Sequence, residues 1–277
     1  MKFQLFSDIH LELCKNIPYI KPLTDYLFLA GDIGNISKPN LKLFIDYCSK
    51  NWKKTFYVLG NHEFYHNNKT YDKLIKAYDE LVSSYNNIYI LNDSFYDLEI
   101  DTTTQYRIYG SVLWSNINST ETINDFNMIK MKNDKNWTVP IDLIYFNQLH
   151  SNSLKKLLDE VKIANLENKK LIVITHFPPI RNNTYHPKYF SQPDYLRNYF
   201  SNDFTELCEK YKTFSQDRFS DGINEKELYS NIECWMSGHT HYSYDFKYKE
   251  TRFISNQLGY FDEIDDTGIN YDIIFEI

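Results

Sequence analysis

The sequence predicts an α/β fold built on parallel β-strands, and three observations support this prediction. Short, nearly continuous apolar runs recur along the chain, for example at Tyr26–Ala30 and Lys170–Ile174. Segments in which apolar residues have helical spacing separate many of these runs. Polar motifs rich in Asp, Asn and His follow the runs directly. This alternation builds parallel sheets through right-handed crossovers, and function then gathers at the carboxyl ends of the strands.

The N-terminal part of the chain predicts alternating strands and helices. We expect strands at residues 3–6, 26–30 and 55–58, and the almost uninterrupted apolar run at 26–30 predicts a strand covered on both faces. Ser37 is expected to cap a helix that has Pro39 in its first turn and Leu41, Phe44, Ile45 and Cys48 on its inward face. A second helix is expected over residues 70–84.

The middle of the chain predicts a more antiparallel region. We expect strands at residues 88–91, 95–100 and 106–114, a long loop at 115–137, a helix at 141–161 and a buried strand at 170–174. Residues 181–230 are irregular, and the closing strands are expected at 232–236, 242–248, 252–255 and 271–277. We interpret residues 1–277 as a single domain, with 115–137 and 181–230 as candidate insertions that cover the substrate.

Composition excludes several classes of protein. A net charge of −7 and a pI near 5.6 argue against an extended nucleic-acid surface, although a small phosphorylated substrate stays compatible. The four cysteines lack CxxC spacing, which favours reduced thiols in an intracellular protein. The N-terminus has no signal-peptide pattern, and no apolar stretch approaches a membrane span. We therefore expect a soluble cytoplasmic protein with no membrane partner; no pattern in the sequence indicates its oligomeric state.

The motifs that follow the apolar runs carry the candidate chemistry. They are Asp8-Ile9-His10, Gly31-Asp32, Gly60-Asn61-His62-Glu63, Thr175-His176 and Gly238-His239-Thr240-His241. Imidazole, carboxylate and amide donors without thiolate favour Mn²⁺, Fe or Zn²⁺ over Mg²⁺ or Ca²⁺. The set is too large for one ion, so two divalent ions are expected. Such a cluster stays cationic and attracts phosphate even on an acidic protein.

Each motif on its own also has an ordinary structural interpretation. Asp-x-His arises by chance, Gly-Asp often marks a turn, and a lone His176 is more often structural than a ligand. Gly-His-Thr-His is stronger, because residues two apart after a strand project to the same side. The set as a whole, with each motif following a strand, favours a metal site over coincidence.

The motif series resembles that of the calcineurin-like metallophosphoesterases over nearly the whole chain. The resemblance implies a four-layer αββα sandwich, in which two mixed β-sheets are flanked by helices and a dinuclear metal site lies at one end. It also implies a hydrolase that acts on phosphoric ester bonds.

Carried over residue by residue, the resemblance implies two ligand sets that share Asp32 as a bridge: Asp8, His10 and His241 for the first ion, and Asn61, His176 and His239 for the second. His62 would not bind metal but would orient the phosphoryl group and protonate the leaving oxygen. Glu63 is expected to have a structural role.

Two departures from the family pattern reduce the range of expected substrates. Phosphoprotein phosphatases extend the second motif to Gly-Asp-x-x-Asp-Arg-Gly and place Arg before Gly-Asn-His-Glu. Here Asn35 replaces the Asp that supports the catalytic His, and Leu59 precedes Gly60. Loss of both phosphate-clamping arginines argues against a phosphoprotein phosphatase. The layout is closer to smaller prokaryotic-type phosphoesterases, including Gly110–Trp114 and Asn256–Tyr260.

The sequence thus favours a phosphodiesterase in which a hydroxide bridging two metals attacks phosphorus while His62 assists the leaving group. Mn²⁺ is the preferred metal, with Fe and Zn²⁺ also suitable. A phosphomonoesterase acting on a nucleotide or another small phosphate is the alternative. A non-catalytic metal-binding scaffold is less favoured, because no ligand position has been lost.

Overall fold

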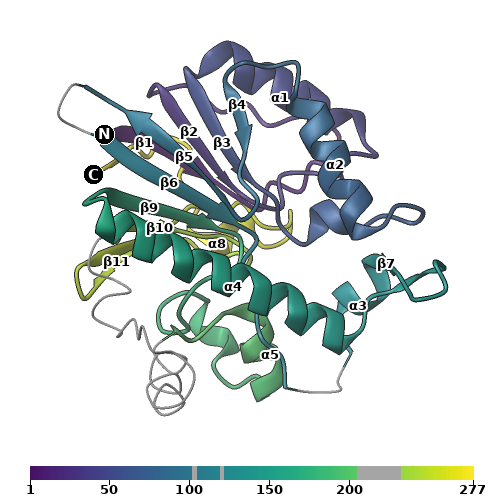
Figure 1. Cartoon of the computed structure of the whole chain (residues 1–277). Helices are drawn as coiled ribbons and strands as arrows, with labels where there is room; N and C mark the ends of the chain where they lie inside the picture. Colours follow the sequence, from purple (N-terminus) through teal and green to yellow (C-terminus); the bar gives the residue numbers. More distant parts are fainter. Residues whose placement is uncertain (102–104, 119–121, 205–231) are drawn as a thin grey trace.

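The computed structural model describes residues 1–101, 105–118, 122–204 and 232–277. Within these residues, two mixed β-sheets pack face to face and helices cover their outer faces (Figure 1). This arrangement confirms the expected four-layer αββα sandwich.

The first sheet has the described strand order β13-β1-β2-β3-β4. Strands β1 to β4 run parallel, whereas β13 is antiparallel to β1. This last pairing places the two chain ends side by side (Figure 1). The strands are β1 (Lys2–Phe6), β2 (Tyr26–Ala30), β3 (Lys54–Val58), β4 (Ile88–Ile90) and β13 (Phe275–Glu276).

The second sheet has the described strand order β11-β12-β10-β9-β6-β5. Its four inner strands are parallel and its two edge strands are antiparallel to their neighbours. The strands are β5 (Ser94–Glu99), β6 (Gln105–Ser111), β9 (Lys170–Thr175), β10 (Ile232–Met236), β11 (Tyr244–Tyr248) and β12 (Thr251–Ser255). A separate antiparallel pair consists of β7 (Lys130–Lys132) and β8 (Thr138–Pro140).

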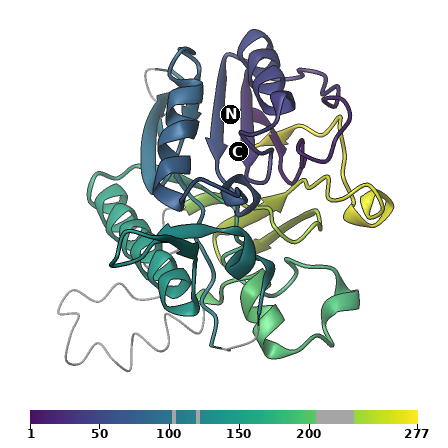
Figure 2. The same ribbon diagram turned by 90° about the vertical axis from the view of Figure 1, so that its right-hand side faces the viewer.

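Helices α1 (Pro39–Asn51) and α2 (Tyr71–Val82) cover the first sheet, and α4 (Leu143–Leu166) covers the second (Figures 1 and 2). The shorter helices are α3 (Asn124–Met128), α5 (Asp194–Phe200), α8 (Ile264–Thr267), η1 (His62–Phe64) and η2 (Pro187–Tyr189). None of the described helices combines the length and the hydropathy that a bilayer span needs.

Strand β2 shows why the apolar runs are almost uninterrupted. Leu27 and Leu29 pack in the cluster beneath α1 and α2, whereas Phe28 and Ala30 pack between the two sheets. Successive side chains of a strand point to opposite faces, and here both faces are buried. Strand β9 alternates in the same way between the space beneath α4 and the space between the sheets. The buried strands predicted at residues 26–30 and 170–174 are therefore confirmed.

Three expected elements differ in detail. Strand β4 belongs to the first sheet and runs parallel to β3, because α2 serves as the crossover between them. Helix α1 begins after Lys38 without a side-chain cap, so the prediction that Ser37 caps it is wrong. Strand β6 ends at Ser111, short of the predicted end, and Leu113 shortly beyond it has a φ of +52°.

The predicted loop and the last strand also differ. Residues 115–137, expected to be a loop, contain α3 and β7, while 119–121 lie outside the described residues. At the C-terminus only Phe275–Glu276 pair as a strand, although a longer one was expected. Most of the irregular segment, residues 205–231, lies outside the described residues, and so does Cys208. The other three cysteines are free thiols.

A buried arginine holds the second sheet to α4. The Arg107 side chain of β6 is only 4% exposed and pairs with Asp97 at 2.8 Å, Glu160 at 2.8 Å and Glu167 at 3.0 Å. Hydrogen bonds from Arg107 lower the pKa of Asp97 to about 2, with burial opposing the shift and Lys169 adding to it. Burying a charge is unfavourable unless it is paired, so these carboxylates keep Arg107 inside.

We expect Asp97→Asn to lower the free energy of unfolding by at most about 1 kcal/mol near pH 5, because Asp97 is partly exposed. A depressed folded-state pKa stabilises the folded chain above the unfolded value of 3.8, and this contribution is lost as pH falls toward 2. Urea unfolding of both proteins from pH 5 to pH 2 checks this. The prediction is wrong if the difference in unfolding free energy between the wild type and Asp97→Asn stays constant over this range. It is also wrong if that difference equals the one caused by the exposed control Asp72→Asn.

Candidate metal centre

The carboxyl ends of strands from both sheets bring the motifs together. Asp8 follows β1, Asp32 follows β2 and His176 follows β9. Their side chains form two groups whose donor atoms lie within 4.8 Å of one another: Asp8 with His10 and His241, and Asp32 with His176 and His239. The resemblance implied the same two groupings, and Asn61 Oδ1 lies beside His176 in the second. A third group of His10, Asp32 and His62 overlaps both, so the geometry alone does not separate His62 from the candidate ligands.

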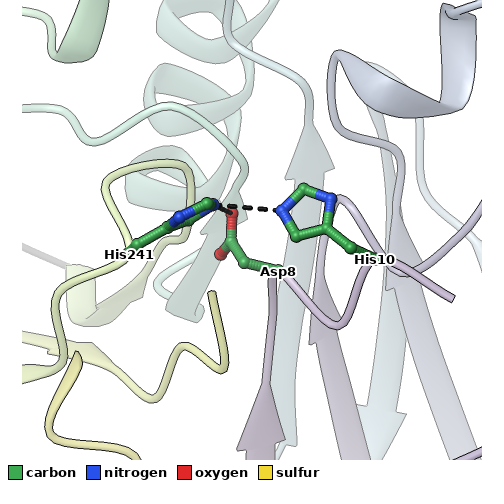
Figure 3. A group of neighbouring side chains, drawn as sticks. All are labelled: Asp8, His10 and His241. Carbon is green, nitrogen blue, oxygen red and sulfur yellow. Dashed lines mark hydrogen bonds and ion pairs between the residues drawn. The ribbon is translucent and has the colours of Figure 1, made fainter. Parts of the chain in front are cut away.

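In the first group, two imidazoles and a carboxylate converge (Figure 3). The Nε2 atoms of His10 and His241 are 3.0 Å apart, and Asp8 Oδ1 is 3.6 Å from His241 Nε2. The Asp8 carboxylate is held by the backbone N–H of His239, at 3.0 and 3.1 Å. Two ring nitrogens and a carboxylate oxygen facing one point are a donor set that a divalent metal accepts.

In the second group, His176 is the centre of the contacts. Its Nδ1 lies 2.9 Å from the carbonyl oxygen of Ala30, which fixes the ring, and its Nε2 lies 3.0 Å from Asn61 Oδ1 and 3.4 Å from Asp32 Oδ1. His239 Nε2 is buried and has no hydrogen-bond partner among the described residues. Burial and the neighbouring His176 hold the pKa of His239 well below its usual value. A neutral imidazole with an unpaired buried nitrogen fits a metal ligand.

The backbone at these positions is left-handed. Five of the seven candidate ligands have positive φ: Asp8 (54°), His10 (50°), Asp32 (53°), His239 (74°) and His241 (50°). Such conformations are uncommon for residues other than glycine and cluster at functional sites. They also break the alternation of a strand, so the direction of each ring does not follow from strand geometry alone. His239 and His241 enter different groups.

Two glycines allow the motif loops to touch. A Cβ on Gly60 would lie 2.2 Å from Asp32 Oδ1 and 2.8 Å from His176 Cε1. Gly31 has a φ of +87°, and its Cβ would lie 2.3 Å from His176 Nδ1. Any side chain at either position would displace a candidate ligand, so glycine is required by close approach.

Comparison with known proteins agrees with this geometry. The sequence profile of the family described as calcineurin-like phosphoesterase matches residues 1–243. The chain belongs to this family. It is therefore a metallophosphoesterase, a hydrolase of phosphoric esters, in a family that is typically dependent on a dinuclear metal centre.

Two known proteins are similar to this chain, one in sequence and one in fold. It is 31% identical over 275 residues to the uncharacterized protein L509 of Acanthamoeba polyphaga mimivirus, covering 92% of this chain and 89% of that protein. Its fold is similar to that of the phosphopantetheinyl hydrolase PptH from Mycobacterium tuberculosis, with a TM-score of 0.65 and 15% identity. That similarity covers 100% of this chain and 95% of the other.

Glu63 ties two motif loops of the phosphoesterase together. Its buried carboxylate accepts hydrogen bonds from the backbone N–H groups of Asp32 at 3.0 Å, Ile33 at 2.8 Å and Gly60 at 2.8 Å, and from the Tyr57 hydroxyl at 2.6 Å. Burial and the charge of Asp32 raise the pKa of Glu63 to about 7, but every bond is donated to the carboxyl, which favours its ionised form. The expected structural role is what this geometry describes.

His62 lies beside both groups and is held by a carboxylate that the sequence did not reveal. Its Nδ1 is 3.1 Å from Glu12 Oε1, and its backbone N–H donates to Asp32 Oδ1 at 2.8 Å. Burial opposes charging of the ring, but Asp32 and Glu12 raise the pKa of His62 to about 9. Asn35 instead supports the backbone, since its amide donates to the carbonyl oxygen of His62 at 3.2 Å. Glu12 thus provides the carboxylate that Asn35 lacks.

Residues near the C-terminus contact the candidate ligands and His62. The Glu263 carboxylate pairs with Nδ1 of His241, leaving Nε2 to face the first group. The Tyr260 hydroxyl lies 3.3 Å from His62 Nε2, and its ring packs against His10 and His241 at centroid distances of 4.7 and 4.6 Å. In the sequence, Tyr260 stands out only as part of a resemblance, and no motif indicates a role for Glu12 or Glu263. The available signals were the position of Glu12 two residues after His10 and that of Glu263 three residues after Tyr260.

We expect Glu63→Gln to lower the free energy of unfolding by about 2–4 kcal/mol, because an amide turns one acceptor into a donor facing buried N–H groups. Affinity for divalent metal should fall as well, since both loops carry candidate ligands. Urea unfolding of the metal-free protein and titration with Mn²⁺ measure the two effects. The exposed control Glu80→Gln on α2 should change neither. Wild-type stability in Glu63→Gln would show that the two loops do not depend on this carboxylate.

Proposed function

We propose that this protein is a dinuclear-metal-dependent phosphodiesterase that acts on a small phosphorylated substrate, with Mn²⁺ as its preferred metal. The observation that carries the proposal is the meeting of two donor groups around Asp32, with His62 beside them. Asp32 belongs to the second group and also lies within the same distance of His10 and His62. Burial opposes ionisation of Asp32, yet His176 and His62 hold its pKa well below the usual range, so it is a carboxylate.

The residues would divide the work as the family resemblance implies. Asp8, His10 and His241 would hold one ion, Asn61, His176 and His239 the other, and Asp32 would contact both. When bound, the two ions would supply Lewis-acid charge and an activated water at phosphorus. The buried, unpaired Nε2 of His239 supports this assignment, because a buried polar atom normally has a partner.

His62 would protonate the leaving oxygen through Nε2. Glu12 engages Nδ1, so the ring is held with Nε2 pointing toward Asp32 Oδ2, 4.0 Å away. The His62 side chain is 18% exposed, which leaves it accessible to substrate. A positioned imidazolium is a suitable general acid near neutral pH, because it donates the proton as the bond to the leaving oxygen breaks.

The preference for diesters follows from a missing arginine. Leu59, which stands where phosphoprotein phosphatases have Arg, is fully buried in the core beneath the helices and presents no cation to substrate. A dianionic monoester gains most from a bidentate arginine, whereas a diester carries a single negative charge. We also infer that residues 1–277 act as one catalytic unit, since Glu263 orients His241 and β13 pairs with β1.

The direct experiment compares bis(p-nitrophenyl) phosphate with p-nitrophenyl phosphate as substrates of the Mn²⁺-loaded protein. We expect faster hydrolysis of the diester, loss of activity after chelation with EDTA, and recovery when Mn²⁺ is restored. Faster hydrolysis of the monoester would make the diester preference wrong. If the folded, metal-loaded protein hydrolyses neither ester, the proposed catalysis fails.

The role of His62 predicts how variants respond to the leaving group. His62→Ala should lower kcat by about 100-fold or more for diesters with a phenol leaving group, and less for p-nitrophenol, which departs without a proton. Glu12→Gln should show the same pattern at smaller amplitude, about 10-fold, with KM little changed. Steady-state kinetics on both esters measures this. The exposed Glu99→Gln serves as the control, and an equal loss on both leaving groups would contradict the acid role.

A further inference from the structure

The amide of Asn61 is held from behind by residues outside the family motifs. Its Nδ2 lies 3.0 Å from Asp125 Oδ1, 3.1 Å from the Tyr65 hydroxyl and 3.3 Å from the Tyr199 hydroxyl. Tyr65 also donates to Asp125 Oδ1 at 2.5 Å. Asp125 is on α3 and Tyr199 is on α5, so the two segments interpreted as insertions meet at one candidate ligand.

These contacts determine which way the amide points. An asparagine side chain has a donor end and an acceptor end that can exchange by rotation, so its partners decide the orientation. Asp125 Oδ1 also receives a hydrogen bond from the Tyr65 hydroxyl, so it acts as an acceptor at this contact and selects the NH₂ end of Asn61. The carbonyl oxygen must then face the opposite way, and it lies 3.0 Å from His176 Nε2 in the second group.

Asp125 occupies a buried position, where a carboxylate does not favour the stability of the fold. Asp125 is completely buried, and its Oδ2 has no hydrogen-bond partner among the described residues. A buried carboxyl group with an unpaired oxygen destabilises a fold more than an apolar residue of similar shape would. Retaining a carboxylate here is understandable if it acts on its neighbour, because carboxylates behind a ligand orient it and raise its basicity.

We propose that Asp125 is a positioning residue for Asn61, which it holds with the carbonyl oxygen turned toward the second metal. This inference rests on the dinuclear centre of the proposed function. Occupancy of the second site then depends on the segment at residues 122–140 and, through Tyr199, on α5. Figure 2 shows both segments, in teal and green, at the same end of the molecule. They contribute to metal binding in addition to any contact with substrate.

The test is a two-site titration of the metal-free protein with Mn²⁺. Asp125→Leu removes the acceptor, and we expect affinity at one of the two sites to fall by about 10- to 100-fold while the other is unchanged. Asp125→Asn should recover part of the loss, because its carbonyl oxygen can still accept from Asn61. Asp134→Leu, an exposed position in the same segment, should bind both ions as the wild type does.

A second measurement tests the direct contact if Asp125→Leu does not fold. Asn61→Asp places two carboxylates about 3 Å apart, which should lower the melting temperature of the metal-free protein. Adding Asp125→Asn to that variant restores one donor facing one acceptor, and the melting temperature should recover. Recovery would show coupling between the two side chains; an additive loss would overturn the proposal.

The outcomes separate this inference from the proposed function. Two wild-type Mn²⁺ sites in Asp125→Leu, or equal weakening of both sites, would overturn the positioning role and leave phosphodiester hydrolysis standing. A wild-type protein that binds two ions but hydrolyses no phosphoester would remove the proposed catalysis and leave the role of Asp125 standing. A wild type that binds no metal would overturn both.

Discussion

The Glu63 carboxylate accepts hydrogen bonds from backbone N–H groups that follow two neighbouring strands, Asp32 and Ile33 after β2 and Gly60 after β3. Backbone groups at the ends of parallel strands have no ladder partner, and inside a protein they need one. One carboxylate supplies it for both loops and fixes their separation. Because Asp32 lies on one loop and Asn61 on the other, the geometry of the candidate centre depends on this interaction.

The same constraint explains how the site tolerates strain. Left-handed backbone at a residue with a side chain costs of order 1 kcal/mol or more, and five candidate ligands have it. The surrounding contacts must therefore hold the backbone in those conformations. The backbone is held by the buried strands on both sides, by the close packing at Gly31 and Gly60, and by the hydrogen bonds to Glu63 and Asp8.

Anions or carbonyl oxygens stand behind most of the candidate ligands and the proposed acid. Glu263 contacts His241, the carbonyl oxygen of Ala30 contacts His176, and Glu12 lies between His10 and His62 at 3.3 and 3.1 Å. Asp125 does the same for the amide of Asn61. Each of these partners binds one polar atom of a side chain and so directs the other polar atom of that side chain into the site. The orientation of the candidate ligands and of His62 is therefore determined by residues that do not themselves bind metal.

The sequence by itself determined the apolar strands, their parallel order around β2 and β3, and the candidate ligand list, because these are recorded in local patterns and in a motif series. The division of the ligands into two groups was already implied by the family resemblance, and only the tertiary structure decided how the members of each group meet. His10 and His241 lie 231 positions apart yet their Nε2 atoms are 3.0 Å from each other, while the His239 ring packs against that of His176. The roles of Glu12, Tyr260, Glu263 and Asp125 do not follow from their positions in the sequence, because these roles arise from contacts between segments that meet only when both sheets and their covering helices are packed.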